Sequence, residues 1–194
     1  IFFNIMLNQW DTSQYCDPGP QTKLEWQWLD MVTTAIGRYT NTYDLIDKIH
    51  TWKNSYLPRI HQGGKFIWKT ETTDIFERHN RSWCHDDAIL VASILRHYKI
   101  PTIMLESIDI ERAHAVQHQK ASDITKNATN ENPMKWHVFL QVYIDGIRQI
   151  LDSSTWKIYP YDPATKIIKD KYYIIAKGKD PADYWVTSLD DLVS

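Results

Sequence analysis

Three side chains in this 194-residue sequence have the types and spacing that thiol catalysis needs. Cys84 lies near the start of a long apolar stretch, and His137 and Asp152 follow in the C-terminal half. In such a trio the imidazole takes the thiol proton, and the carboxylate fixes the ring tautomer and stabilises its charge. The three residues therefore predict a nucleophilic cysteine, provided that the fold brings them together.

Residues 81 to 102 are typical of a helix with the cysteine in its first turn. We expect Ser82 to cap the first turn, where Asp86 and Asp87 place negative charge at the positive end of the helix. Pro101 ends the helix. Apolar residues recur at three- and four-residue spacing with few polar positions between them, so this helix is expected to be buried on most sides.

The position of Cys84 allows two interpretations. A free cysteine is often an inert, buried apolar residue. A helix N-terminus can instead lower the thiol pKa and produce a nucleophilic thiolate, although the charges of Asp86 and Asp87 oppose this. The sequence also holds a second cysteine, Cys16, in a turn-rich segment, and a disulfide between the two would abolish catalysis.

The histidine and the aspartate belong to a predicted β-hairpin. The segment that begins at Trp136 alternates between apolar and other residues, and Asp145-Gly146 is a strong two-residue turn. Counting back from the turn puts His137 and Asp152 on one face as diagonal neighbours, on the order of 7 Å apart at the backbone. That distance allows an imidazole–carboxylate hydrogen bond.

This pattern resembles the transglutaminase-like superfamily of papain-fold cysteine enzymes. The family's nucleophile block matches Cys84, Asp86, Ala88, Leu95, Arg96, Ile100 and Pro101. Its histidine block matches His137, Tyr143, Asp145, Gly146 and Asp152, whereas Phe139 and Gln141 stand where the family usually has Trp and Glu. A weaker third block, residues 49 to 57, resembles the helix that precedes the nucleophile block.

The resemblance implies an α+β fold of the papain-like or transglutaminase-like kind in one domain, residues 1–194. A helical N-terminal half with the buried nucleophile helix would pack on a C-terminal antiparallel sheet. In this fold the backbone N–H of the nucleophile and an upstream side chain hold the oxyanion. Trp52, Trp68 and Gln62 are the candidates here for that side chain, and each also fits a purely structural role.

The function implied is acyl transfer through a thioester, with a triad of Cys84, His137 and Asp152 acting on peptide or glutamine-type amide bonds. A cysteine peptidase or amidohydrolase without a cofactor is the first expectation, and its partner is a protein or peptide substrate. A protein-glutamine transglutaminase or deamidase shares the first half-reaction. A binding module that kept the fold without activity is the alternative from another class.

Further elements follow from the same patterns. An amphipathic helix is expected over residues 22 to 38, a second that Thr42 caps and that runs through Leu57, and a short third from Thr73 to Arg78. Strands are expected at 102 to 108 and 171 to 176. The segment DSSTWKIYPYDP is interpreted as an exit from the sheet into a turn, and the last residues as a short helix.

Composition excludes several classes of function. The net charge is −2 and no basic block occurs, which gives no electrostatic surface for nucleic acid. No apolar run approaches the ~20 residues of a membrane span. The opening IFFNIML is too short for a signal peptide, and a start at Ile suggests that an N-terminal segment was removed. We expect a soluble monomer, cytoplasmic or exported after processing.

His114 and His118 are the one pair with metal-ligand spacing. On a helix they would share a face, but the zinc-protease signature needs Glu at position 115, where the sequence has Ala. A solvated polar face is the preferred interpretation, and no metal is expected. The polar stretch at 120 to 135 is interpreted as a mobile loop that could border the substrate cleft or act as a lid.

Overall fold

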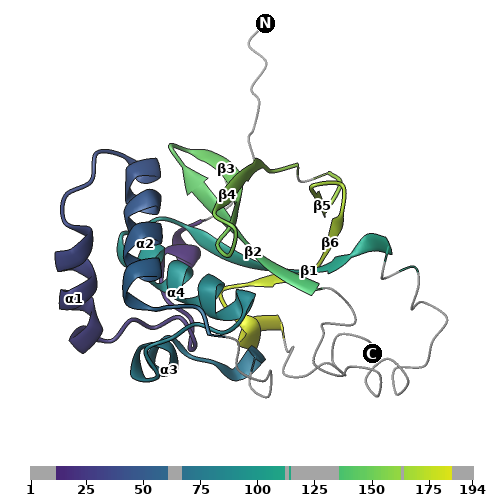
Figure 1. Ribbon diagram of the computed structural model, residues 1–194. Coiled ribbons are helices and arrows are strands. Elements are labelled where there is room, and N and C mark those ends of the chain that lie inside the picture. Colours follow the sequence, from purple (N-terminus) through teal and green to yellow (C-terminus); the bar gives the residue numbers. More distant parts are fainter. Residues whose placement is uncertain (1–11, 61–66, 112–113, 115–135, 163, 185–194) are drawn as a thin grey trace, which may run out of the picture.

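The structure is a computed structural model that describes residues 12–60, 67–111, 114, 136–162 and 164–184. Within these ranges, helices make up the N-terminal half and one antiparallel sheet the C-terminal half, as Figure 1 shows. This confirms the predicted α+β class and its order along the chain. The helices are α1 (Trp26–Ile36), α2 (Thr42–Tyr56), α3 (Thr72–Glu77) and α4 (Cys84–His97), with 3₁₀ turns η1 (Ser13–Cys16), η2 (Ile67–Lys69) and η3 (Pro181–Tyr184).

The helix predicted to begin near Cys84 is confirmed as α4, but its predicted cap is wrong. The helix begins at Cys84 with Trp83 as its N-cap, and Ser82 does not cap it. Ser82 instead donates its backbone N–H to Asp86 Oδ2 at 2.6 Å. The Asp86 carboxylate thus bonds the chain that precedes the helix, whereas a capping serine hydroxyl would have accepted from a backbone N–H of the first turn.

The remainder of α4 is largely apolar and is inaccessible as far as Arg96. Every residue from 85 to 96 is buried, which confirms the expectation of a helix surrounded by protein. The chain leaves the helix through Lys99, whose positive φ of 61° is incompatible with a further helical turn. Pro101 then directs it into the first strand.

The other helices are confirmed with shorter or shifted ends. α1 begins at Trp26, four residues after the expected start, and α2 is capped by Asn41, whose side chain accepts from the backbone N–H of Asp44. The predicted Thr42 cap is therefore wrong by one residue. α3 begins at Thr72 after an N-cap at Glu71, one residue before the predicted start.

The sheet has six strands in the order β4-β3-β2-β1-β6-β5, all paired antiparallel. Its strands are β1 (Thr102–Asp109), β2 (Trp136–Ile144), β3 (Ile147–Asp152), β4 (Lys157–Pro160), β5 (Ile167–Ile168) and β6 (Tyr172–Gly178). The predicted turn at Asp145-Gly146 joins β2 to β3 with φ of 50° and 80°. Ile144 pairs with Ile147, so the predicted register is confirmed.

Two strands were missed, the short β5 (Ile167–Ile168) and β4 (Lys157–Pro160). Residues 157–160 do not leave the sheet but return as β4 along the edge of β3. The turn-rich sequence DSSTW is the tight connection that reverses the chain, with Trp156 at a φ of 59°. The expected exit from the sheet at this point is therefore wrong.

The largest core lies between the helices and one face of the sheet. It joins apolar residues of α2, α3 and α4 to the side chains of β2 that alternate from Val138 to Ile144. A second, smaller core on the opposite face contains Leu105, Phe139 and Ile150. The sheet is therefore covered on both faces, and α4 is held between its neighbouring helices and strands.

Candidate active site

Cys84 is the first residue of α4, where the backbone N–H has no acceptor within the helix. The residue is partly exposed and its thiol is free, as is that of Cys16, so the disulfide considered from the sequence is ruled out. Cys16 lies at the opposite end of α4, where its Sγ is 3.5 Å from the carbonyl oxygen of Lys99. The two thiols therefore have separate surroundings.

His137 and Asp152 meet as the hairpin register predicted. His137 Nε2 lies 3.0 Å from Asp152 Oδ1, and the side chains are 16% and 3% exposed. Asp152 Oδ1 also accepts from the backbone N–H groups of Ser154 and Thr155, which fixes the carboxylate at the start of the β3–β4 turn. An imidazole anchored through Nε2 presents Nδ1 as its second nitrogen.

Cys84 and His137 act on each other's protonation, each favouring the charged form of the other. Burial is the largest influence on the Cys84 pKa and raises it, but hydrogen bonds and charge from His137 and His85 together lower it to about 6. For His137, burial is again the largest influence and lowers the pKa. The bonds to Asp152 and Cys84 outweigh it and raise the pKa to about 9.

The pKa of Asp152 falls to about 2, because the contacts with His137 and the turn outweigh the opposing effect of burial. Between about pH 6 and pH 9 the preferred state of the trio is consequently a thiolate, an imidazolium and a carboxylate. This is the protonation state in which a cysteine attacks a carbonyl carbon.

Aromatic rings enclose the imidazole. The ring of His137 lies 4.6 Å from Phe139 in an edge-to-face arrangement and 5.7 Å from Tyr172 of β6. Phe139 and Gln141, which stand where the resemblance led us to expect Trp and Glu, are both buried. Because these contacts restrict rotation of the ring, they help to keep it between the thiol and the carboxylate.

The charges of Asp86 and Asp87 are balanced, so they do not oppose the thiolate as the sequence indicated. Asp86 Oδ2 lies 2.6 Å from Arg78 Nη2. Asp87 is fully buried, and it pairs with Arg81 and with Lys53, whose Nζ is 2.5 Å from Oδ1.

The buried Asp87 cluster also connects α4 to the turn that carries Asp152. Lys53 Nζ donates to the carbonyl oxygen of Ser153 at 2.6 Å, and the hydroxyl of Ser154 donates to Asp87 Oδ2 at 3.3 Å. Burial lowers the pKa of Lys53 to about 8, despite its contact with Asp87. This cluster therefore links the element that carries the thiol to the turn that carries the carboxylate.

A second imidazole at the thiol was missed by the sequence interpretation. His85 Nδ1 lies 3.9 Å from Cys84 Sγ, and His85 Nε2 lies 2.9 Å from Glu106 Oε2 of β1. A signal was present in the sequence, because Glu106 interrupts an apolar strand and a buried carboxylate needs a partner. The sequence gave no register between α4 and β1 that could have identified the partner.

Of the oxyanion candidates, Trp68 lies beside the site. It is 6% exposed, its ring centroid is 5.6 Å from that of His85, and its indole N–H is buried without a hydrogen-bond acceptor among the described residues. Trp52 instead packs in the large core against Tyr56 and Phe76. Gln62 lies outside the described residues.

Comparisons with known proteins identify a shared fold. No family model matches this chain, and no curated protein matches it. A solved structure does match, that of a "putative cysteine protease" from Cytophaga hutchinsonii, with a TM-score of 0.62 and 19% sequence identity. The two chains have the same fold. The match covers 92% of this chain and 50% of the other, so this chain spans about half the length of that protein.

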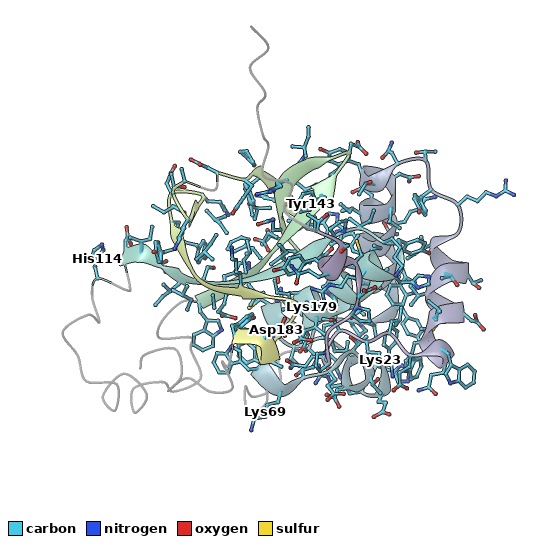
Figure 2. The ribbon with its side chains drawn as sticks, turned by 180° about the vertical axis from the view of Figure 1, so that it is seen from behind. Lys23, Lys69, His114, Tyr143, Lys179 and Asp183 are labelled. Atoms are coloured by element: carbon cyan, nitrogen blue, oxygen red, sulfur yellow. The ribbon has the colours of Figure 1, made fainter. Side chains whose placement is uncertain are left out.

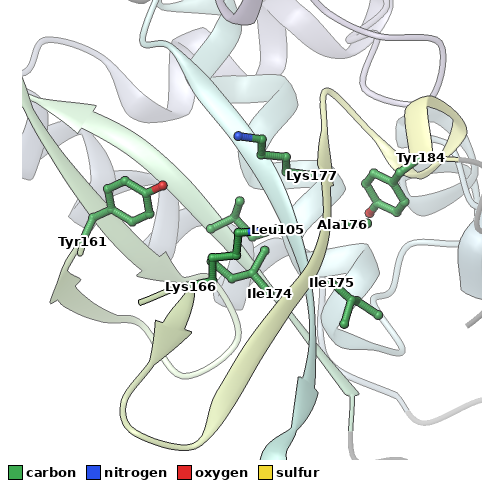
Figure 3. A pocket seen from close by; sticks show the side chains of 8 residues that line it. All are labelled: Leu105, Tyr161, Lys166, Ile174, Ile175, Ala176, Lys177 and Tyr184. Carbon is green, nitrogen blue, oxygen red and sulfur yellow. The ribbon is translucent and has the colours of Figure 1, made fainter. Parts of the chain in front are cut away.

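A cavity of about 400 Å³ is lined by residues of β1, β6, η3 and the segment that follows β4 (Figure 3). Its lining includes Leu105, Tyr161, Lys166, Ile174, Lys177 and Tyr184. The hydroxyl of Tyr184 donates to Glu106 at 3.4 Å, and Ile174 follows Tyr172, the ring that contacts His137, by two positions on β6. The imidazole–carboxylate pairs do not line the cavity themselves, and Tyr184 is the lining residue that contacts one of them, through Glu106.

The structure describes only one residue of the predicted histidine pair. His114 is exposed and lies at the edge of the molecule, far from α1 (Figure 2), while His118 and the stretch at 120 to 135 lie outside the described residues. In the described part of the chain, no group of three or more His, Cys, Asp or Glu side chains could hold a metal. Every helix in that part is too short or too polar to cross a membrane.

Proposed function

We propose that this protein is a cysteine-dependent acyl-transfer enzyme of the transglutaminase-like kind, acting as a hydrolase on peptide or glutamine-type amide bonds. Cys84 is the nucleophile, His137 the proton shuttle and Asp152 the residue that orients His137. The observation that carries the proposal is the His137 imidazole, which lies 3.0 Å from Asp152 Oδ1 and lowers the pKa of the Cys84 thiol at the start of α4.

In the first half-reaction the Cys84 thiolate attacks the carbonyl carbon of a protein or peptide substrate. The carbon–nitrogen bond breaks, and the imidazolium of His137 gives its proton to the leaving amine or ammonia. The products are a Cys84 thioester and a neutral His137. The pKa of about 9 on His137 means that the proton is available at neutral pH.

In the second half-reaction a nucleophile resolves the thioester. Neutral His137 takes a proton from water, whose oxygen attacks the thioester carbon, and the carbon–sulfur bond breaks to release an acid and the thiolate. An amine in place of water would give a transglutaminase. The described residues offer no marked amine site, and hydrolysis is therefore the proposed outcome.

The oxyanion is proposed to bind between two donors. One is the backbone N–H of Cys84, which the helix leaves without an acceptor. The other is the indole N–H of Trp68, which is buried and unpaired among the described residues. A donor that lacks a partner in the resting protein gains its hydrogen bond only when charge develops on the substrate oxygen, which favours the transition state.

Incubating the protein with glutamine-containing peptides, with and without the amine monodansylcadaverine, tests this proposal. Ammonia or cleaved peptide without amine incorporation indicates hydrolysis, and a fluorescent adduct indicates transfer. Cys84→Ala should abolish either activity, whereas Cys16→Ala, the matched control, should retain it. Activity that survives in Cys84→Ala, or the absence of any amide turnover, would contradict the proposal and favour a binding module.

A further inference from the structure

His85 occupies an unusual position behind the nucleophile. Its side chain is 0% exposed, and its ring lies between two acidic groups, with Nδ1 3.9 Å from Cys84 Sγ and Nε2 2.9 Å from Glu106 Oε2. The edge of Trp68 packs on the same ring. The imidazole of His85 is therefore closer to the Cys84 sulfur than the carboxylate of Glu106 is. A positive charge on the imidazole consequently acts on the thiol more strongly than the negative charge of Glu106 does.

The surroundings of Glu106 favour a protonated imidazole. Glu106 is fully buried, and among the described residues His85 is its only cationic partner within 4 Å. The hydroxyl of Tyr184 donates to the same oxygen at 3.4 Å, while Oε1 has no partner in the described part of the chain. A buried carboxylate requires a counter-charge, and burial alone would instead discharge the histidine. The contacts with Glu106 and Cys84 outweigh that effect and raise the pKa of His85 to about 10.

His85 is not a second proton shuttle. A general acid must reach the leaving group of the substrate, but both ring nitrogens of His85 are directed at protein groups, Nδ1 at Cys84 Sγ and Nε2 at Glu106 Oε2. His137, at 16% exposure, has that access. The two imidazole–carboxylate pairs at the thiol thus differ in accessibility, which separates their roles.

We infer that His85 is a positioning residue: a fixed imidazolium, held by Glu106, that stabilises the Cys84 thiolate while His137 carries the moving proton. The inference rests on the proposed function, because it gives Cys84 the role of nucleophile. It assigns His85 two effects. The thiolate forms at lower pH before attack, and the sulfur that leaves the thioester during hydrolysis departs beside a permanent positive charge.

The test is the pH midpoint of Cys84 alkylation by iodoacetamide, resolved by site with mass spectrometry. His85→Gln and Glu106→Gln should each raise the midpoint by about one pH unit or more, which is at least a tenfold drop in thiolate fraction below the midpoint. The double variant should raise the midpoint no further than His85→Gln alone, because Glu106 supports the thiolate only through the ring. His97→Gln, an exposed histidine on the same helix, is the matched control and should leave the midpoint unchanged.

If His85→Gln does not fold, two other measurements still test the inference. They are the alkylation midpoint of Glu106→Gln and the ¹⁵N spectrum of the His85 ring in the unmodified protein. His85 should carry protons on both ring nitrogens at about pH 8, well above the ordinary histidine pKa of about 6.5. A neutral His85 ring, or a midpoint that Glu106→Gln leaves in place, overturns the inference.

The failure of this inference is distinguishable from that of the proposed function. A low Cys84 midpoint that His137→Ala raises, but that the His85 and Glu106 variants do not, removes only the role of His85. A midpoint in the unmodified protein near the ordinary thiol value, unaffected by His137→Ala, removes the nucleophile itself and the proposed function with it.

Discussion

Replacing His137 with alanine is expected to raise the pKa of Cys84, because the hydrogen bond from His137 is the largest influence that lowers it. The thiol pKa of about 6 in the folded protein compares with an ordinary value of 9.0. A difference of this size corresponds to about 4 kcal/mol between the thiol and thiolate forms. His85 remains in the variant, so only part of this is lost, and we expect a rise of at least about one unit, or ~1.4 kcal/mol.

The assay is the rate of iodoacetamide alkylation at Cys84 as a function of pH. Below the midpoint, each unit of pKa rise reduces the thiolate fraction about tenfold, but the more basic thiolate is about threefold more nucleophilic. The net loss of rate at a fixed pH is therefore only about threefold, so the midpoint is the informative quantity. Cys16 serves as an internal reference, because burial is the largest influence on its pKa and raises it above the ordinary value.

Two results would refute this reasoning. A Cys84 midpoint close to that of Cys16 in the unmodified protein would mean that no thiolate–imidazolium pair forms. A low midpoint that His137→Ala leaves unchanged would mean that His137 does not support the thiolate. A parallel shift of Cys16 in the variant would point to a general structural change, which the Cys84 shift alone would not reveal.

Activity should follow a bell-shaped pH profile, rising through about pH 6 as Cys84 loses its proton and falling through about pH 9 as His137 loses its own. In Asp152→Asn, kcat/KM should fall by on the order of 10²-fold or more. The alkaline limb of the pH profile should move to lower pH, because His137 loses its carboxylate partner. An unchanged alkaline limb would count against the orienting role of Asp152. Trp68→Phe should lower kcat by about 10²–10³-fold with little effect on KM or on Cys84 alkylation, whereas a pure KM effect would exclude an oxyanion donor. Asp87→Ala should reduce the free energy of unfolding, measured in urea, by about 3–5 kcal/mol, because it leaves Lys53 and Arg81 buried without their counter-charge. As the control, Asp30→Ala at an exposed position should leave the free energy of unfolding nearly unchanged.

The parts of the site that the sequence predicted are those fixed by local geometry. A two-residue turn at Asp145-Gly146 sets the register of a hairpin, and the register alone brings His137 to Asp152. The helix that carries Cys84 could be recognised because its apolar residues repeat at helical spacing. In both cases short-range rules determine the outcome, so no knowledge of the remaining fold was needed.

The parts that the sequence did not predict depend on contacts between distant elements. His85 and Glu106 come from a helix and a strand whose relative placement is set by core packing. The same holds for Asp87, whose charge was expected to oppose the thiolate until Lys53 and Arg81 were seen to balance it. The strand β4 was missed because the residues that reverse the chain before it have the composition of a loop.

The central claim is that Cys84 forms a thioester, and trapping that intermediate tests it most directly. The protein would be mixed with p-nitrophenyl acetate, quenched in acid within the first turnover and mapped by mass spectrometry. We predict a stoichiometric release of nitrophenolate together with an acetyl group on Cys84, retained in Cys16→Ala and strongly reduced in His137→Ala. An unmodified Cys84, or acetylation of Cys84 at a rate that His137→Ala leaves unchanged, would contradict the claim.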